Sequence, residues 1–224
     1  MGDLPTVGFY GKLPCRGDFI QRRVPREFVE PWDAWLQECL TQSRGQLQER
    51  WLDAYLVSPV WRFALAGGVC GEAAYAGVLL PSVDLVGRYF PLTLVARWDV
   101  AMSPLMTACS QDSWFELVQA LALEALDAAT LDFDDFDRRV AALSSCWYVP
   151  SASGRSVQSA LSTVVFQELE RALSPISLWW TEGSNDIAPA VLCMSGLPDP
   201  AGFAAMLSGR NQNSLALNCP RHDS

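Results

Sequence analysis

The chain has 224 residues, of which half are apolar and 18% are charged, and its formal net charge is −9. This composition is that of a folded globular protein, and an acidic chain without a cluster of basic residues is not expected to bind nucleic acid. Because the N-terminus lacks the pattern of a signal peptide and no uncharged run is long enough to cross a bilayer, we expect a cytoplasmic protein that does not insert into membranes.

The first half of the chain is expected to supply most of the strands. They are predicted at 7–13, 61–66, 74–80 and 89–98. The strand at 89–98 is apolar on both faces, which is typical of a central strand covered by helices on each side, and Pro91 indicates that its pairing begins only after that residue. Between the first two strands, apolar residues at helical spacing predict a helix that ends near Thr41 and another at about 46–55.

The second half of the chain is expected to be mainly helical. Helices are predicted at 112–127, 133–143, 157–173 and 200–207, and two more strands at 177–180 and 191–194. No repeat, low-complexity tract or linker divides the chain, so we expect a single domain over residues 1–209, followed by a polar, frayed tail at 210–224. Strands early and late, with helices between them, predict an α/β fold: a three-layer α-β-α sandwich around one mixed sheet.

The sequence offers little material for catalysis. The only histidine, His222, lies two residues from the C-terminus, where it is a poor candidate for a positioned base. Gly11 and Lys12 do not form a phosphate-binding loop, since Leu13 stands where a Ser or Thr would hold Mg²⁺. We therefore expect no catalytic residue, and a protein that is not an enzyme.

Metal and cofactor sites are not expected either. The seven cysteines are spread evenly without a C-x-x-C pair, which argues against zinc or iron–sulfur ligation and predicts free thiols in a reducing cytosol. The acidic cluster of Asp132, Asp134, Asp135 and Asp137 lacks the turn glycine and closing glutamate of a calcium loop. We interpret it as the start of a helix, where the helix dipole favours negative charge.

Three segments are notable because polar residues interrupt strongly apolar sequence. They are Gly8–Phe19 (GFYGKLPCRGDF), Gly77–Leu92 (GVLLPSVDLVGRYFPL) and Ser177–Gly183 (SLWWTEG). Together with the phrase Phe28–Asp33 (FVEPWD), and in this order, these segments resemble the TagF (ImpM) family of type VI secretion accessory proteins. The resemblance covers most of the chain, apart from a stretch at about 100–175 that carries no recognisable motif.

The resemblance implies a function without catalysis or cofactor. TagF proteins look like post-translational repressors of type VI secretion that act in the cytoplasm by binding the forkhead-associated scaffold protein of the apparatus. Two other readings are open: a small-molecule or nucleotide sensor that uses the loops of Lys12, Arg16 and Arg88 as an anion pocket, and a structural subunit of the apparatus.

The candidate partner-binding residues come from these motifs. They are Lys12, Arg16, Asp18, Ser82, Asp84, Arg88, Trp179 and Trp180. In the first two motifs an apolar strand ends at a proline and a small polar turn follows, so the two loops would converge if their strands run parallel and near each other. A structural role is the alternative: Asp84 and Arg88 as an ion pair around the turn at Gly87. Adjacent tryptophans on a strand point to opposite faces, so at most one of them would face a partner.

Overall fold

The structure is a computed structural model, and it is described here for residues 4–98, 103–127, 131–147, 168 and 171–209. Its strands are β1 (Thr6–Gly11), β2 (Ile20–Arg22), β3 (Trp61–Leu65), β4 (Ala74–Leu80), β5 (Leu92–Trp98), β6 (Ile176–Thr181) and β7 (Ala190–Ser195). Its helices are α1 (Arg26–Leu47), α2 (Trp51–Leu56), α3 (Pro104–Ser110), α4 (Asp112–Glu124), α5 (Phe133–Ala142) and α7 (Pro200–Ser208), with short 3₁₀ turns at Gln48–Arg50 and Leu143–Cys146.

All seven strands belong to one sheet, in the order β2-β1-β5-β4-β3-β6-β7. The expectation of a mixed sheet is corrected in one respect, because every pair of neighbouring strands is antiparallel. Strands that are apolar on both faces are common in parallel sheets, but the physical cause is cover on both faces and not strand direction. Here helices cover both faces, so antiparallel strands show the same pattern.

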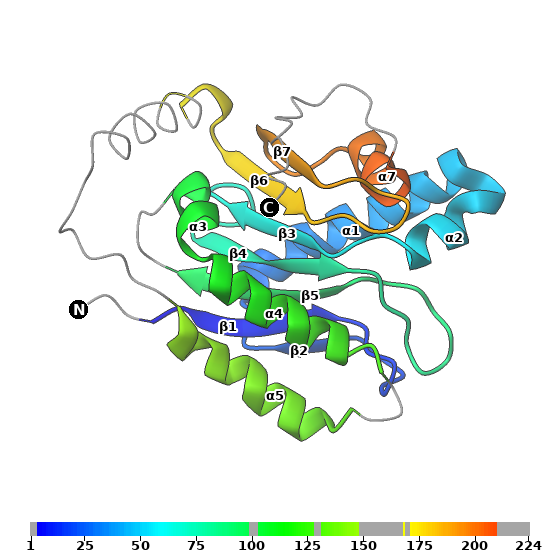
Figure 1. Ribbon diagram of the computed structural model, residues 1–224, viewed down its shortest axis with the longest axis horizontal. Coiled ribbons are helices and arrows are strands. Elements are labelled where there is room, and N and C mark those ends of the chain that lie inside the picture. Colours follow the sequence, from blue (N-terminus) through cyan, green and yellow to red (C-terminus); the bar gives the residue numbers. More distant parts are fainter. Residues whose placement is uncertain (1–3, 99–102, 128–130, 148–167, 169–170, 210–224) are drawn as a thin grey trace, which may run out of the picture.

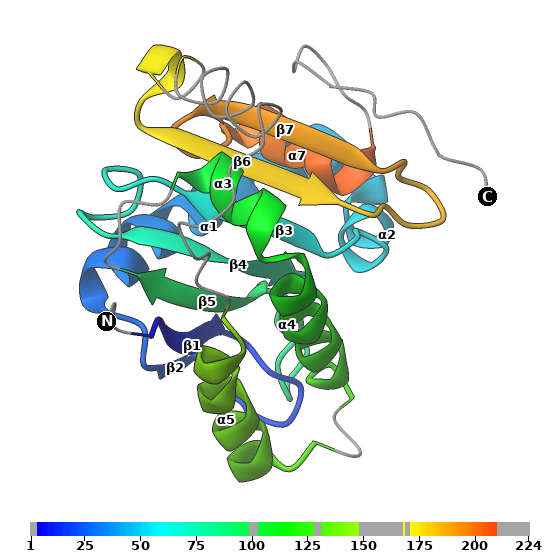
Figure 2. The ribbon, with the colours of Figure 1, turned by 60° about the vertical axis from the view of Figure 1, so that its left-hand side comes forward.

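Two helical layers enclose the sheet, which confirms the three-layer α-β-α sandwich (Figures 1 and 2). One layer contains α1, α2 and α7, and the other contains α3, α4 and α5. The two faces of β3 illustrate the division: Phe63 packs into the core under α1, and Ala64 faces the core under α4. Ala64, Ala76 and Ala96 lie side by side across three strands, and these small side chains let α4 approach the sheet closely.

Several sequence expectations are met within a residue or two. The strand predicted at 74–80 has these bounds in the structure, and β5 begins directly after Pro91, as expected. Asp132 caps α5, since its carboxylate accepts hydrogen bonds from the backbone N–H groups of Asp134 and Asp135, which confirms the reading of the acidic cluster as a helix start. The tail at 210–224 falls outside the described residues. So does the helix predicted at 157–173, except for residue 168 and residues 171–173.

Candidate functional site

The first two motifs follow strands that end at the same edge of the sheet. β1 and β4 both pair antiparallel with β5, which lies between them, so β1 and β4 run parallel to each other. Gly11 at the end of β1 and Leu80 at the end of β4 are both in register with Leu92. The loops that follow, residues 12–19 and 81–91, therefore emerge side by side. We call them the two-loop site, and their convergence confirms the expectation drawn from the sequence.

Two glycines shape the loops. Gly11 has φ +130°, and a Cβ atom at this position would collide with the backbone oxygen of Pro91. Gly87 has φ +87° at the turn of the second loop, with open space around it. Both conformations are costly for residues with a side chain, so the glycines allow the first strand to lie close to the second loop and allow that loop to turn back.

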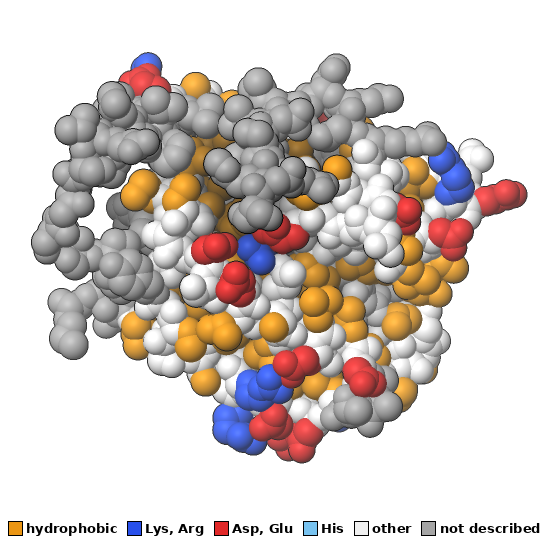
Figure 3. All heavy atoms as spheres, viewed as in Figure 1, with side chains coloured by type: hydrophobic (Ala, Val, Ile, Leu, Met, Phe, Trp, Pro, Cys, Tyr) orange, Lys and Arg blue, Asp and Glu red, His pale blue; other side chains and the backbone are white. Residues whose placement is uncertain are grey.

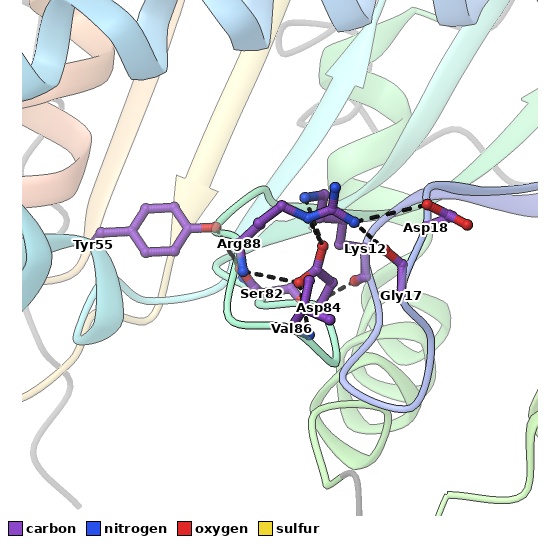
Figure 4. A network of polar contacts seen from close by, with 8 residues as sticks. All are labelled: Lys12, Gly17, Asp18, Tyr55, Ser82, Asp84, Val86 and Arg88. Carbon is purple, nitrogen blue, oxygen red and sulfur yellow. Dashed lines mark hydrogen bonds and ion pairs between the residues drawn. The ribbon is translucent and has the colours of Figure 1, made fainter.

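A buried ion pair joins the two loops (Figure 4). The Nζ atom of Lys12 lies 2.8 Å from Oδ2 of Asp84, and the two side chains are 6% and 0% exposed. Oδ2 of Asp84 also accepts a hydrogen bond of 2.7 Å from Nε of Arg88, so the predicted pair between Asp84 and Arg88 around Gly87 is confirmed. One carboxylate thus binds one cation from each loop.

The same carboxylate fixes the backbone of its own loop. Oδ1 of Asp84 accepts hydrogen bonds from the backbone N–H groups of Val86 and Arg88, at 3.1 and 2.8 Å. Burial alone would raise the pKa of the Asp84 carboxyl, but the hydrogen bonds from Lys12 and from the backbone and side chain of Arg88 outweigh it and hold the pKa well below its usual range. Asp84 is therefore a buried, ionised residue whose oxygens are occupied by partners within the protein.

A tyrosine of the helical layer that contains α1, α2 and α7 holds the start of the second loop in place. The hydroxyl of Tyr55, in α2, donates to the backbone oxygen of Ser82 at 2.9 Å and accepts from the backbone nitrogen of Ser82 at 3.0 Å. The Ser82 hydroxyl in turn donates to the backbone oxygen of Lys12 at 2.8 Å. Burial raises the pKa of Tyr55. No sequence motif includes Tyr55. It lies 27 positions before Ser82, and nothing in the sequence indicates that the two residues are in contact.

The rim of the two-loop site is exposed. The Arg88 guanidinium donates to the backbone oxygen of Gly17 and lies 3.8 Å from the fully exposed carboxylate of Asp18, a contact that solvent screens. Arg16 joins through its backbone, whose oxygen accepts from the N–H of Leu85 at 2.9 Å, while its guanidinium lies over the ring of Phe133 at 4.4 Å. One network of polar contacts thus joins five of the predicted residues: Lys12, Asp18, Ser82, Asp84 and Arg88. The side chain of Arg16 is not part of this network, because it packs on Phe133.

The two tryptophans of the third motif point to opposite faces of β6, as predicted. Trp179 has no exposed surface and stacks on Trp32 of α1, with ring centroids 5.9 Å apart. Trp180 lies on the other face, in edge contact with Phe115 of α4 at 4.6 Å. Trp179 therefore offers no surface to a partner in the folded protein. Trp180 is partly buried against the other core, and neither residue belongs to the two-loop site.

The described part of the chain contains no group of three or more His, Cys, Asp or Glu side chains that could hold a metal ion. None of its helices has the length and apolar character needed to cross a bilayer. Charged side chains on the face seen in Figure 3 form small groups of mixed sign, one of them over α5, separated by uncharged surface. This surface shows no single-sign patch that would favour one charged ligand.

The fold and the two-loop site define a class of protein: an α/β domain whose charged motif residues fix two adjacent loops. The model of the TagF N-terminal domain, which is type VI secretion system-associated, matches residues 8–143, a span that includes both loops. The chain therefore belongs to the TagF family.

A solved structure agrees with this assignment. The crystal structure of PA0076 from Pseudomonas aeruginosa PAO1 is similar to this chain with a TM-score of 0.81 and 35% sequence identity, over 98% of this chain and 99% of that chain. No curated protein matches the sequence. The family assignment makes this chain an accessory protein of type VI secretion.

Proposed function

We propose that this protein is a non-enzymatic, post-translational repressor of type VI secretion that acts in the cytoplasm by binding the forkhead-associated scaffold protein of the apparatus. One observation carries the proposal beyond the family assignment. The charged motif residues neutralise one another inside the two-loop site, while the second loop turns apolar side chains toward solvent. This arrangement suits a surface that recognises another protein.

The state of the charged groups argues against a catalytic role. A general base needs a pKa near the working pH and a free lone pair aimed at the substrate. The pKa of Asp84 is held low, and its oxygens already accept hydrogen bonds from Lys12, Val86 and Arg88. Lys12 is buried and faces Asp84, so it is not presented to a ligand. These groups are arranged to hold loops.

Direct binding tests the proposal. The purified chain and the purified scaffold protein are mixed and their affinity is measured by isothermal titration calorimetry, with another soluble type VI component as the control. We expect a saturable complex with the scaffold alone. In the native host, raised levels of the chain should lower effector release without lowering the amounts of the other components. Absence of a complex would contradict the proposed partner, and unchanged release would contradict repression.

A sensor of small anions is the second candidate, and one observation favours it. A cavity of about 510 Å³ opens beside the first loop, and its lining includes two cations, Arg16 and Arg22, and one carboxylate, Asp18. Both guanidinium groups lie over the ring of Phe133. The anion pocket expected from sequence used Lys12, Arg16 and Arg88, but Asp84 pairs with both Lys12 and Arg88, and of the three only Arg16 lines this cavity. A rise in melting temperature with phosphate or a nucleotide, lost in Arg16→Gln, would support this function. Co-sedimentation with the assembled apparatus would instead favour a structural subunit.

A further inference from the structure

We propose that Leu85 and Val86, at the tip of the loop between β4 and β5, are the apolar anchor through which this protein binds its partner, and that Lys12, Asp84 and Arg88 are positioning residues for that tip. This inference rests on the proposed function and deepens it by naming the surface. The tip would enter an apolar pocket on a folded protein whose rim is neutral to weakly acidic.

Exposure singles out the tip. Leu85 is 66% exposed and Val86 is 68% exposed, the highest values among the large hydrophobic side chains that the structure describes as exposed. They are adjacent in sequence, and Phe19 of the neighbouring loop is also exposed, at 49%. A single exposed apolar residue is ordinary, but two neighbours at the apex of one loop form a compact apolar projection.

The backbone of the tip is fixed before any partner arrives. Four consecutive N–H groups, those of residues 85–88, are each hydrogen-bonded within the protein: to Arg16 O, Asp84 Oδ1, Asp84 O and again Asp84 Oδ1. The base of the loop is closed by hydrogen bonds from Asp84 N to Arg88 O and from Phe90 N to Ser82 O. Binding then orders little new structure, and pre-organisation of this kind improves affinity.

The buried ion pair supports a positioning role. Removing Lys12 and Asp84 from water is costly, and an apolar pair of similar volume often stabilises a core as well or better. What the charged pair adds is geometry, because one carboxylate sets the place of both loops and the turn that carries Leu85 and Val86. The same residues would be poorly explained as a device for stability alone.

The charge around the tip indicates the rim of the partner pocket. The protein as a whole carries a net charge of −9. The two loops, however, carry Lys12, Arg16 and Arg88 against Asp18 and Asp84, which is three positive charges against two negative ones. The tip therefore lacks the negative excess of the rest of the chain, and a neutral to weakly acidic surface can approach it without repulsion.

A matched pair of double variants tests the inference. Leu85→Ser/Val86→Ser alters the tip, and Leu56→Ser/Val57→Ser alters another adjacent Leu–Val pair, exposed at 54% and 45% at the end of α2. Affinity for the purified scaffold protein is measured by titration calorimetry, and the folded state by circular dichroism and melting temperature. We expect the tip variant to raise Kd at least about tenfold with an unchanged fold, and the α2 variant to bind as the wild type does.

The outcomes separate the inference from the proposed function. If the wild type binds the scaffold and the tip variant binds equally well, the tip is not the anchor, although the proposed function stands. Equal losses in both double variants would also overturn the inference, because binding would then depend on apolar surface in general. If the wild type does not bind the scaffold at all, the proposed function fails and the inference fails with it.

Discussion

Asp84 shows how one carboxylate can organise a site without acting as a base. Its pKa is held low by hydrogen bonds from Lys12 and Arg88, which overcome the effect of burial. A carboxyl whose pKa is lowered on folding stabilises the protein fully above its unfolded pKa of about 3.9, and this contribution is lost as the pH falls through the folded pKa. Part of the acid sensitivity of the fold should therefore come from this residue.

Urea unfolding of Asp84→Asn over a range from about pH 7 to about pH 2 checks this expectation. The variant should be less stable than the wild type near neutrality, and the difference should shrink as the pH falls below about 4. Asp18→Asn serves as the control, because the fully exposed Asp18 carboxylate contributes little. A constant difference between Asp84→Asn and the wild type over the whole range would contradict the assignment.

Gly11 allows a second prediction at the residue scale. Alanine at this position would be strained for two reasons: its Cβ atom would collide with the backbone oxygen of Pro91, and its backbone would have to keep φ near +130°. We therefore expect Gly11→Ala to lower the free energy of unfolding by about 1–3 kcal/mol. Gly45→Ala is a control of opposite sign, since Gly45 lies in α1 with open space around it and alanine should stabilise the helix by about 0.5–1 kcal/mol. Urea midpoints measure both, and a neutral Gly11→Ala would show that the loop can shift.

At the scale of elements, β6 divides its two tryptophans between the two cores. Trp179 is fully buried and contacts Trp32, Trp35 and Phe63, whereas Trp180 is only partly buried against Phe115. Trp179→Ala should cost about 3–5 kcal/mol in the free energy of unfolding, and Trp180→Ala clearly less. Chemical denaturation followed by circular dichroism decides the matter, and equal losses would show that the two faces of β6 are equally packed.

The elements also show what a sequence can reveal. Elements with a clear apolar pattern could be placed closely: β4 is a continuous apolar run that ends before Pro81, and α4 has apolar residues at helical spacing. β2 has three residues, too few for a periodic pattern, and α3 is a short helix preceded by the cap of Ser103; neither was expected. Strand direction was also missed, since cover on both faces gives parallel and antiparallel strands the same composition.

The candidate site was predictable to a similar degree. The shared pattern of strand, proline and polar turn was enough to bring the two loops together, and the pair of Asp84 and Arg88 followed from their spacing around Gly87. The clamp from Tyr55 and the buried state of Lys12 could not be foreseen, because both depend on how distant segments pack. The chemistry that surrounds a motif residue is set by its neighbours in space.

For the whole molecule, the distribution of cysteines yields a further prediction. Cys39 and Cys70 are buried in the core under α1, and burial raises the pKa of each thiol to about 12. Because the thiolate is the reactive form, both should resist iodoacetamide in the folded protein, while the exposed Cys146 reacts. Peptide mass spectrometry of the natively labelled protein measures this, and rapid labelling of Cys39 or Cys70 would contradict the described core.

Complete denaturation extends the same experiment. All seven cysteines should then react without prior reduction, as expected of free thiols in a reducing compartment. A lower count under anaerobic handling would reveal a disulfide.

The link between Lys12 and Asp84 spans 72 positions of the chain. Its geometry requires β1 and β4 both to be in place beside β5, which lies between them. A nascent or partly unfolded chain therefore lacks the brace that shapes the tip of the second loop. Leu85 and Val86 take their final geometry only when the centre of the sheet is complete. A partner that binds this tip would therefore distinguish fully folded molecules from incompletely folded ones.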